Sequence, residues 1–138
     1  MLNTMLLIVF GNFSQPSLVV SDYELAERNR IVQESIQKQN QLKQDFLNKE
    51  TECLAKTIFL EARGESTQGQ RLVAQTVVNR TKNPSFPKTV CGVVKSKLRG
   101  VCSFSSCSKW NDKIRDRLSY TKANKIATRA LQGHYKKL

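Results

Sequence analysis

Apolar residues recur at near-helical spacing in a long polar segment near the start of the chain. Residues 22–50 are rich in Gln and contain neither Gly nor Pro, so the pattern predicts an amphipathic helix or a helical spacer. Ser21 or Asp22 is expected to cap its start. The apolar positions that mark one face of this helix are Leu25, Val32, Ile36 and Phe46.

A denser apolar pattern begins at Cys53. Residues 53–61 predict a helix with one apolar face, and Gly64 is expected to end it because glycine adopts the left-handed conformation at little cost. A second helix is predicted to start at Thr67, with Gln70 reaching back to complete a capping box. Pro84 lies just beyond its end and cannot continue a helix.

The remaining residues predict further short helices and no convincing strand. We expect helices over 89–97, 112–118 and 121–131, with a loop at 100–108 that carries two cysteines. The fold class is therefore mainly α, a compact helical domain preceded by an N-terminal helix. The predicted organisation is an N-terminal arm, signal or anchor over 1–21, the spacer over 22–50, and the domain over 51–138.

The first residues leave two interpretations open. Residues 5–10 form an apolar run, followed by a stretch interrupted by Asn12, Gln15 and Pro16, which is too short and too broken to predict a membrane span. A signal peptide contains such a run, but no Lys or Arg precedes this one. The segment is either an export signal or anchor, or a buried or frayed arm.

Charge is distributed unevenly along the 138 residues. The net charge is +12, and residues 80–138 hold 15 basic but only 2 acidic side chains, Asp112 and Asp116. Such a polycation is attracted to nucleic acid, anionic lipid or an anionic cell envelope, or it is simply a solvated basic surface. The composition, 39 % apolar and 25 % charged, excludes collagen-like, fully disordered and multi-span membrane chains.

Four cysteines and one histidine limit the possible chemistry. An even set of cysteines in a small basic domain is typical of one or two disulfides in an oxidising compartment, although four reduced, buried thiols are an alternative. No C-x-x-C pair is present, so a zinc site is disfavoured, and we expect no metal and no cofactor. The candidate disulfide residues are Cys53, Cys91, Cys102 and Cys107.

The segment Glu61-Ala62-Arg63-Gly64-Glu65 places two carboxylates around a predicted helix end. In the last turn of an apolar helix, the dipole and burial both disfavour an ionised Glu61, so this side chain could donate a proton. Protonating the departing oxygen is what cleavage of a glycosidic bond requires. Arg63 must point elsewhere for this to hold, and Glu65 is expected to have a structural or orienting role near the next helix start.

A wider set of motifs resembles the SleB-type cell-wall hydrolases, which include the catalytic domain of spore-cortex-lytic enzymes. The resemblance covers about residues 52–134 and does not extend to 1–50. It rests on the order E-A-R-G-E from Glu61, G-Q at 69–70, N-R at 79–80, F-P at 86–87, V-C-G-V-V at 90–94 and C-S-F-S at 102–105.

The resemblance implies a lysozyme-like, mainly helical fold that cleaves peptidoglycan between N-acetylmuramic acid and N-acetylglucosamine outside the cytoplasm. Glu61 would be the acid/base, forming an anhydro ring with the muramoyl 6-hydroxyl or activating water. Gln70, Phe104 and Ser105 would line the sugar groove, although Gln70 could instead belong to the capping box and Phe104 to the core. Peptidoglycan strands and the anionic envelope are the implied partners.

The chain also departs from the family pattern. Phe59 stands where the family commonly has Tyr, and Cys107 follows the C-S-F-S segment one residue earlier than usual. Cys102 is expected to pair with either Cys91 or Cys107. Two other functions are alternatives. The first is a non-catalytic wall-binding or virion structural module. The second is a basic nucleic-acid binder, without specific recognition because only 7 % of the residues are aromatic and could stack on bases.

Overall fold

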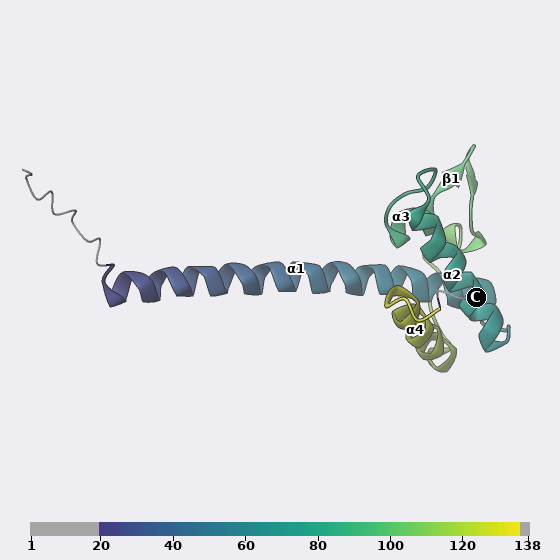
Figure 1. Ribbon diagram of the computed structural model, residues 1–138. Coiled ribbons are helices and arrows are strands. Elements are labelled where there is room, and N and C mark those ends of the chain that lie inside the picture. Colours follow the sequence, from purple (N-terminus) through teal and green to yellow (C-terminus); the bar gives the residue numbers. More distant parts are fainter. Residues whose placement is uncertain (1–19, 136–138) are drawn as a thin grey trace, which may run out of the picture. The chain divides into compact units, whose positions relative to one another are not determined.

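The structure is a computed structural model, and it describes residues 20–135. The apolar run at 5–10, on which the prediction of an export signal, anchor or arm depends, lies outside these residues. The elements, shown in Figure 1, are α1 (Asp22–Ala62), α2 (Thr67–Lys82), α3 (Val90–Lys95), β1 (Lys97–Leu98), β2 (Val101–Cys102), the 3-10 turn η1 (Ser105–Cys107) and α4 (Arg117–Leu131). The prediction of a mainly helical fold is confirmed.

The described residues form two compact units that divide between Lys38 and Gln39, within α1. The first unit is helical and starts with a capping box, in which Ser21 Oγ accepts from the Glu24 N–H and the Glu24 carboxylate accepts from the Ser21 N–H. This confirms Ser21 as the cap. None of the helices within residues 20–135 has both the length and the apolar character that a membrane crossing requires.

The core of the second unit is built by the last turns of α1 together with α2, α3 and α4. Leu54 and Ile58 of α1, Val77 of α2 and Val93 of α3 are fully buried, and Ala127 of α4 closes the same cluster. Helix α2 packs against both α3 and α4 (Figure 1). The small side chains on α4 let its backbone approach the other helices closely.

Two predictions about helix starts are corrected by the structure. Helix α2 is capped by Ser66, whose hydroxyl accepts from the Gly69 N–H at 3.2 Å, so Thr67 is the first helical residue and the predicted capping box of Thr67 and Gln70 is wrong. The predicted separate helix over 112–118 is also wrong. Asp116 caps α4 by accepting from the Ser119 N–H, and an N-cap residue lies outside the helix that it starts.

A two-stranded hairpin follows α3, where no strand was predicted. Strands β1 and β2 pair antiparallel, with Lys97 opposite Cys102 and Leu98 opposite Val101. The two-residue connection places Arg99 at φ 51° and Gly100 at φ 83°, the left-handed values that a tight type I′ hairpin turn needs. Arginine is unusual at such a position, so residues 99–100 do not show the usual pattern of a hairpin turn.

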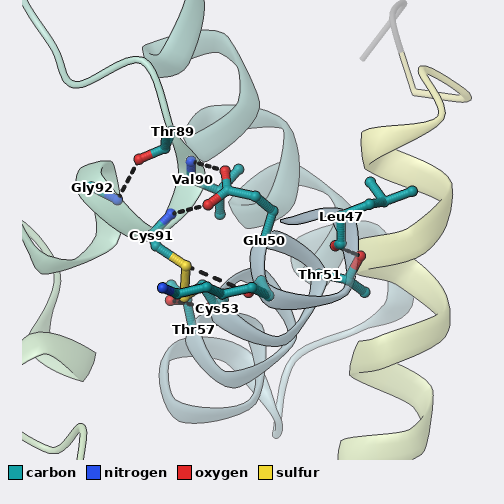
Figure 2. Close-up of a disulfide and its surroundings, with 10 residues drawn as sticks. Leu47, Glu50, Thr51, Cys53, Thr57, Thr89, Val90, Cys91 and Gly92 are labelled. Atoms are coloured by element: carbon teal, nitrogen blue, oxygen red, sulfur yellow. Dashed lines mark hydrogen bonds between the residues drawn. A yellow bond between two sulfur atoms is a disulfide. The ribbon is translucent and has the colours of Figure 1, made fainter. Parts of the chain in front are cut away.

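Two disulfides hold the second unit together. Cys53 pairs with Cys91 and joins α1 to α3, while Cys102 pairs with Cys107 across a separation of 5 residues. The second pair is one of the two that the sequence allowed for Cys102. Figure 2 shows the first disulfide beside Glu50, whose carboxylate accepts hydrogen bonds from the Val90 and Cys91 N–H groups.

Candidate active site

Glu61 lies in the last turn of α1, as predicted, and its carboxylate receives hydrogen bonds from η1. Ser105 Oγ lies 3.0 Å from each carboxylate oxygen, and the Ser106 N–H donates to Oε1 at 2.5 Å. Glu61 is half-buried and has no cation within 4 Å, because both ion pairs found among residues 20–135 involve Arg30. The carboxylate is therefore oriented by neutral donors alone.

Ser105 donates to Glu61 through its side chain, and Ser106 donates through its backbone. Ser105 was predicted at the site, but Ser106 was not, since it contributes a backbone N–H that any residue except proline carries.

The hairpin and its disulfide place η1 against Glu61. The chain turns back at Arg99 and Gly100, returns along β2 to Cys102, and the Cys102–Cys107 bond closes the loop that contains Phe104, Ser105 and Ser106. Ser106 is fully buried, so the loop is anchored at its centre. The short spacing of the two cysteines thus fixes the backbone that holds the glutamate.

A hollow of about 310 Å³ opens beside the carboxylate, and we call it the Glu61 hollow. Its lining residues come from α1, α2 and the disulfide loop, namely Glu61, Leu72, Val73, Thr76 and Phe104. The Arg80 guanidinium packs against the Phe104 ring, 4.8 Å from its centroid, and lies 5.2 Å from the centroid of the Phe86 ring. An aromatic wall beside a carboxyl group is suited to the apolar face of a sugar ring.

Gln70 does not line this hollow. It is buried, and its Nε2 donates to the backbone carbonyls of Glu65 at 3.1 Å and Arg63 at 3.4 Å. Its amide therefore ties together the turn between α1 and α2. The structure places Gln70 as a support for the helix end that carries Glu61.

Arg63 points away from Glu61, as a proton-donating role for that glutamate requires. Its guanidinium lies 5.6 Å from the centroid of the Phe59 ring, which also meets Tyr120 edge to face. Phe59 is buried. A tyrosine at this position, which the resemblance led us to expect, would need a hydrogen-bond partner for its hydroxyl within the core. The Glu65 side chain is exposed, and only its backbone carbonyl supports the turn.

The part of the chain that the structure describes contains no group of three or more His, Cys, Asp or Glu side chains able to hold a metal ion. All four cysteines are joined in disulfides. The side chains that converge on the Glu61 hollow are thus a carboxyl group, hydroxyl groups, an aromatic ring and aliphatic groups.

The family model described as "Cell Wall Hydrolase" matches residues 64–138, which is more than half of the chain. The chain belongs to the cell wall hydrolase family. This confirms the recognition of a SleB-type domain, and the match begins three residues after Glu61.

Three spore cortex-lytic enzymes are similar to this family member. The one from Bacillus subtilis is 41 % identical over 49 residues, covering 36 % of this chain and 16 % of that enzyme. Those from Halalkalibacterium halodurans and Oceanobacillus iheyensis are each 33 % identical, over 60 and 76 residues, covering 44 % and 53 % of this chain. The matches span 18 % and 27 % of those two enzymes, so the chain covers well under a third of each relative. No solved structure matches the chain.

Proposed function

We propose that the chain degrades peptidoglycan outside the cytoplasm by cleaving the bond between N-acetylmuramic acid and N-acetylglucosamine, with Glu61 as acid/base. The observation that carries the proposal is the position of Glu61, oriented by Ser105 and Ser106 at the edge of a hollow with an aromatic wall. Family membership supports the substrate class. The basic second half of the chain would attract the anionic envelope.

The first step needs a protonated Glu61. A sugar bound against Phe104 displaces water from the hollow, and lower polarity favours the neutral carboxylic acid. Glu61 then gives its proton to the glycosidic oxygen as the bond from that oxygen to muramoyl C1 breaks. Negative charge develops on the Glu61 carboxylate at this moment, and the Ser105 O–H and Ser106 N–H already point at it.

The second step returns the proton. The Glu61 carboxylate accepts a proton from the muramoyl 6-hydroxyl as O6 bonds to C1, which gives an anhydro sugar, or from a water whose oxygen bonds to C1. In the first route the substrate supplies its own nucleophile, so a second catalytic carboxylate is unnecessary. This agrees with a hollow whose one lining carboxylate is Glu61.

The test is lysis of purified peptidoglycan by the oxidised full chain, followed as loss of turbidity. Glu61→Gln should lower the rate by at least about a hundredfold, the usual contribution of a general acid. Glu52→Gln, an exposed carboxylate on the same helix, is the matched control and should retain full activity. Mass spectrometry of the released muropeptides distinguishes the routes, since the anhydro product is lighter by one water.

Two results would contradict the proposal. Undiminished lysis by a folded Glu61→Gln chain would exclude Glu61 as the acid. Sedimentation of the wild-type chain with peptidoglycan, without release of soluble muropeptides, would indicate the non-catalytic wall-binding module instead.

A further inference from the structure

A second hollow, strongly basic, lies at the same end of α1. It measures about 280 Å³, and we call it the basic hollow. Four of its lining side chains are cationic, one is a carboxylate, and two are apolar. The lining residues are Arg63, Lys109, Lys113 and Arg115, with Asp112, Phe59 and Leu60.

The four cations of the basic hollow have no carboxylate partner within 4 Å. The two ion pairs found among residues 20–135 join Arg30 to Glu27 and to Glu34, far along α1. Asp116, which feels the charge of Arg63, is engaged as the cap of α4 by the Ser119 N–H and hydroxyl. Four cations and the single carboxylate of Asp112 leave this hollow with an excess of positive charge, and a bound anion relieves the repulsion among the cations.

The floor of the basic hollow is apolar and rigid. Phe59 is buried and Leu60 is half-buried, and Arg63 stacks over the Phe59 ring. An arginine held in this way loses little further freedom when it binds a carboxylate. The hollow therefore suits an anion attached to a small apolar group rather than a free inorganic ion.

The basic hollow and the Glu61 hollow share the last turn of α1, to which the basic hollow adds residues 109–115 and the Glu61 hollow adds α2 and Phe104. Leu60 and Glu61 are consecutive on α1, and consecutive helical side chains diverge by about 100°, so the two residues line different hollows. The loop that contacts Glu61 through Ser105 and Ser106 continues directly to Lys109. Lining residues of the two hollows are thus neighbours at the last turn of α1, through Leu60 and Glu61.

We propose that the basic hollow binds a carboxylate of the peptide stem of peptidoglycan, an inference that rests on the proposed function. The stem is attached to the muramic acid whose bond would be cleaved, so covalent attachment keeps it within reach of a hollow lined by the neighbour of Glu61. Each extended stem residue adds about 3.5 Å of reach, and the alanine methyl groups of such stems match the apolar floor. Phosphate polymers of the wall lack this fixed relation to the reacting bond.

The first experiment compares intact peptidoglycan with glycan strands from which an amidase has removed the stems. The variant is Lys109→Glu/Lys113→Glu, two exposed residues whose side chains make no hydrogen bond in residues 20–135. The matched control is Lys122→Glu/Lys125→Glu, with the same charge change on the exposed face of α4.

The hollow variant should raise KM about fivefold on intact peptidoglycan, as expected from loss and reversal of exposed charge contacts. The kcat of the hollow variant should be unchanged. On stem-free strands, its KM should equal the KM of Lys122→Glu/Lys125→Glu. The stem assignment would be overturned in favour of general attraction to the wall if KM rose equally on intact peptidoglycan and on stem-free strands. Equal increases of KM in the hollow variant and the control variant would overturn it in the same way. A variant defect that vanishes when wall phosphate polymers are stripped, with the stems intact, would overturn it in favour of phosphate.

A binding experiment separates this inference from the proposed function. A soluble stem peptide with free carboxyl groups should bind the Glu61→Gln chain and shift NMR resonances of residues 109–115. The same peptide with its carboxyl groups amidated should not bind. Wild-type protein that cleaves neither substrate would overturn the proposed function alone, whereas equal affinity for both peptides, or for neither, would overturn the carboxylate site alone.

Discussion

Glu50 and Glu61 lie on the same helix and have similar surroundings, yet we propose a structural role for Glu50 and a catalytic role for Glu61. Each carboxylate accepts a backbone N–H from a short helical segment, Glu50 from the start of α3 and Glu61 from η1. Each also lies beside a disulfide, Cys53–Cys91 for Glu50 (Figure 2) and Cys102–Cys107 for Glu61. A hydrogen-bonded glutamate next to a disulfide is therefore not by itself a mark of catalysis.

The two glutamates differ in access and in the segment that holds them. Glu50 is 6 % exposed, so its carboxylate is enclosed by the protein, whereas Glu61 lines an open hollow. The disulfide near Glu50 joins residues 38 positions apart, and the one near Glu61 joins residues 5 apart. We infer that the first arrangement stabilises the fold and the second shapes the site, and four predictions test this difference.

The largest expected effect is on stability, from removing the long-range disulfide. Chain entropy in the unfolded state makes Cys53→Ala/Cys91→Ala less stable by about 4 kcal/mol. Urea denaturation monitored by circular dichroism measures this free energy. Lysis per folded molecule should be retained in mild conditions, and a loss of activity without a loss of stability would contradict the assignment of this disulfide to the fold.

The next largest effect is expected from Glu50→Ala. The substitution leaves the Val90 and Cys91 N–H groups at the start of α3 without their acceptor, which should lower the free energy of unfolding by about 3 kcal/mol. Glu52→Ala, an exposed neighbour on the same helix, should change it by much less. Similar losses from both variants would show that Glu50 contributes only helix propensity.

Much of this architecture follows from the sequence, because apolar spacing reports which helix faces are buried. The apolar face predicted for the helix over residues 53–61 is buried, and Leu54 and Ile58 lie in the core. The position of Glu61 at a helix end also followed from the glycine after it. These features depend on local pattern alone, which a single sequence displays well.

The rest depended on contacts between distant residues or on the backbone. Glu50 is separated by 40 residues from Val90, and nothing in a polar helical segment distinguishes a glutamate that will be buried from one that will be solvated. Strands of two residues are too short to show alternation, so the hairpin that positions η1 was missed. The capping box at Thr67 and the helix over 112–118 were wrong because Ser66 and Asp116 cap α2 and α4 instead.

A smaller loss of stability, with a loss of activity, is expected from removing the short-range disulfide. Closing a loop of this size contributes about 2 kcal/mol, so Cys102→Ala/Cys107→Ala should remain folded. Its lysis rate should fall about tenfold, the value of one to two hydrogen bonds, because Ser105 and Ser106 are no longer held against Glu61. Turbidity assays should therefore show that this variant is less active than Cys53→Ala/Cys91→Ala, whereas urea denaturation should show that it is more stable. Full activity without the short disulfide would show that the fold alone positions η1.

The smallest effect on stability is expected from Asp116, the cap of α4. Its carboxylate also accepts a backbone N–H, but it belongs to the segment that follows both disulfides. Hydrogen bonds from the Ser119 side chain and N–H hold the pKa of Asp116 below its usual value, with a smaller contribution from the charge of Arg63. A carboxyl group whose pKa is lowered by folding stabilises the native state above its unfolded pKa of about 3.9, and this stabilisation is lost as the pH falls through the folded pKa. Asp116→Ala should therefore lower Tm slightly at pH 7, and the difference from wild type should shrink as the pH is brought below 4. A Tm difference for Asp116→Ala that stays constant down to acidic pH would mean that lost helix capping by the neutral group, rather than its charge, accounts for the effect.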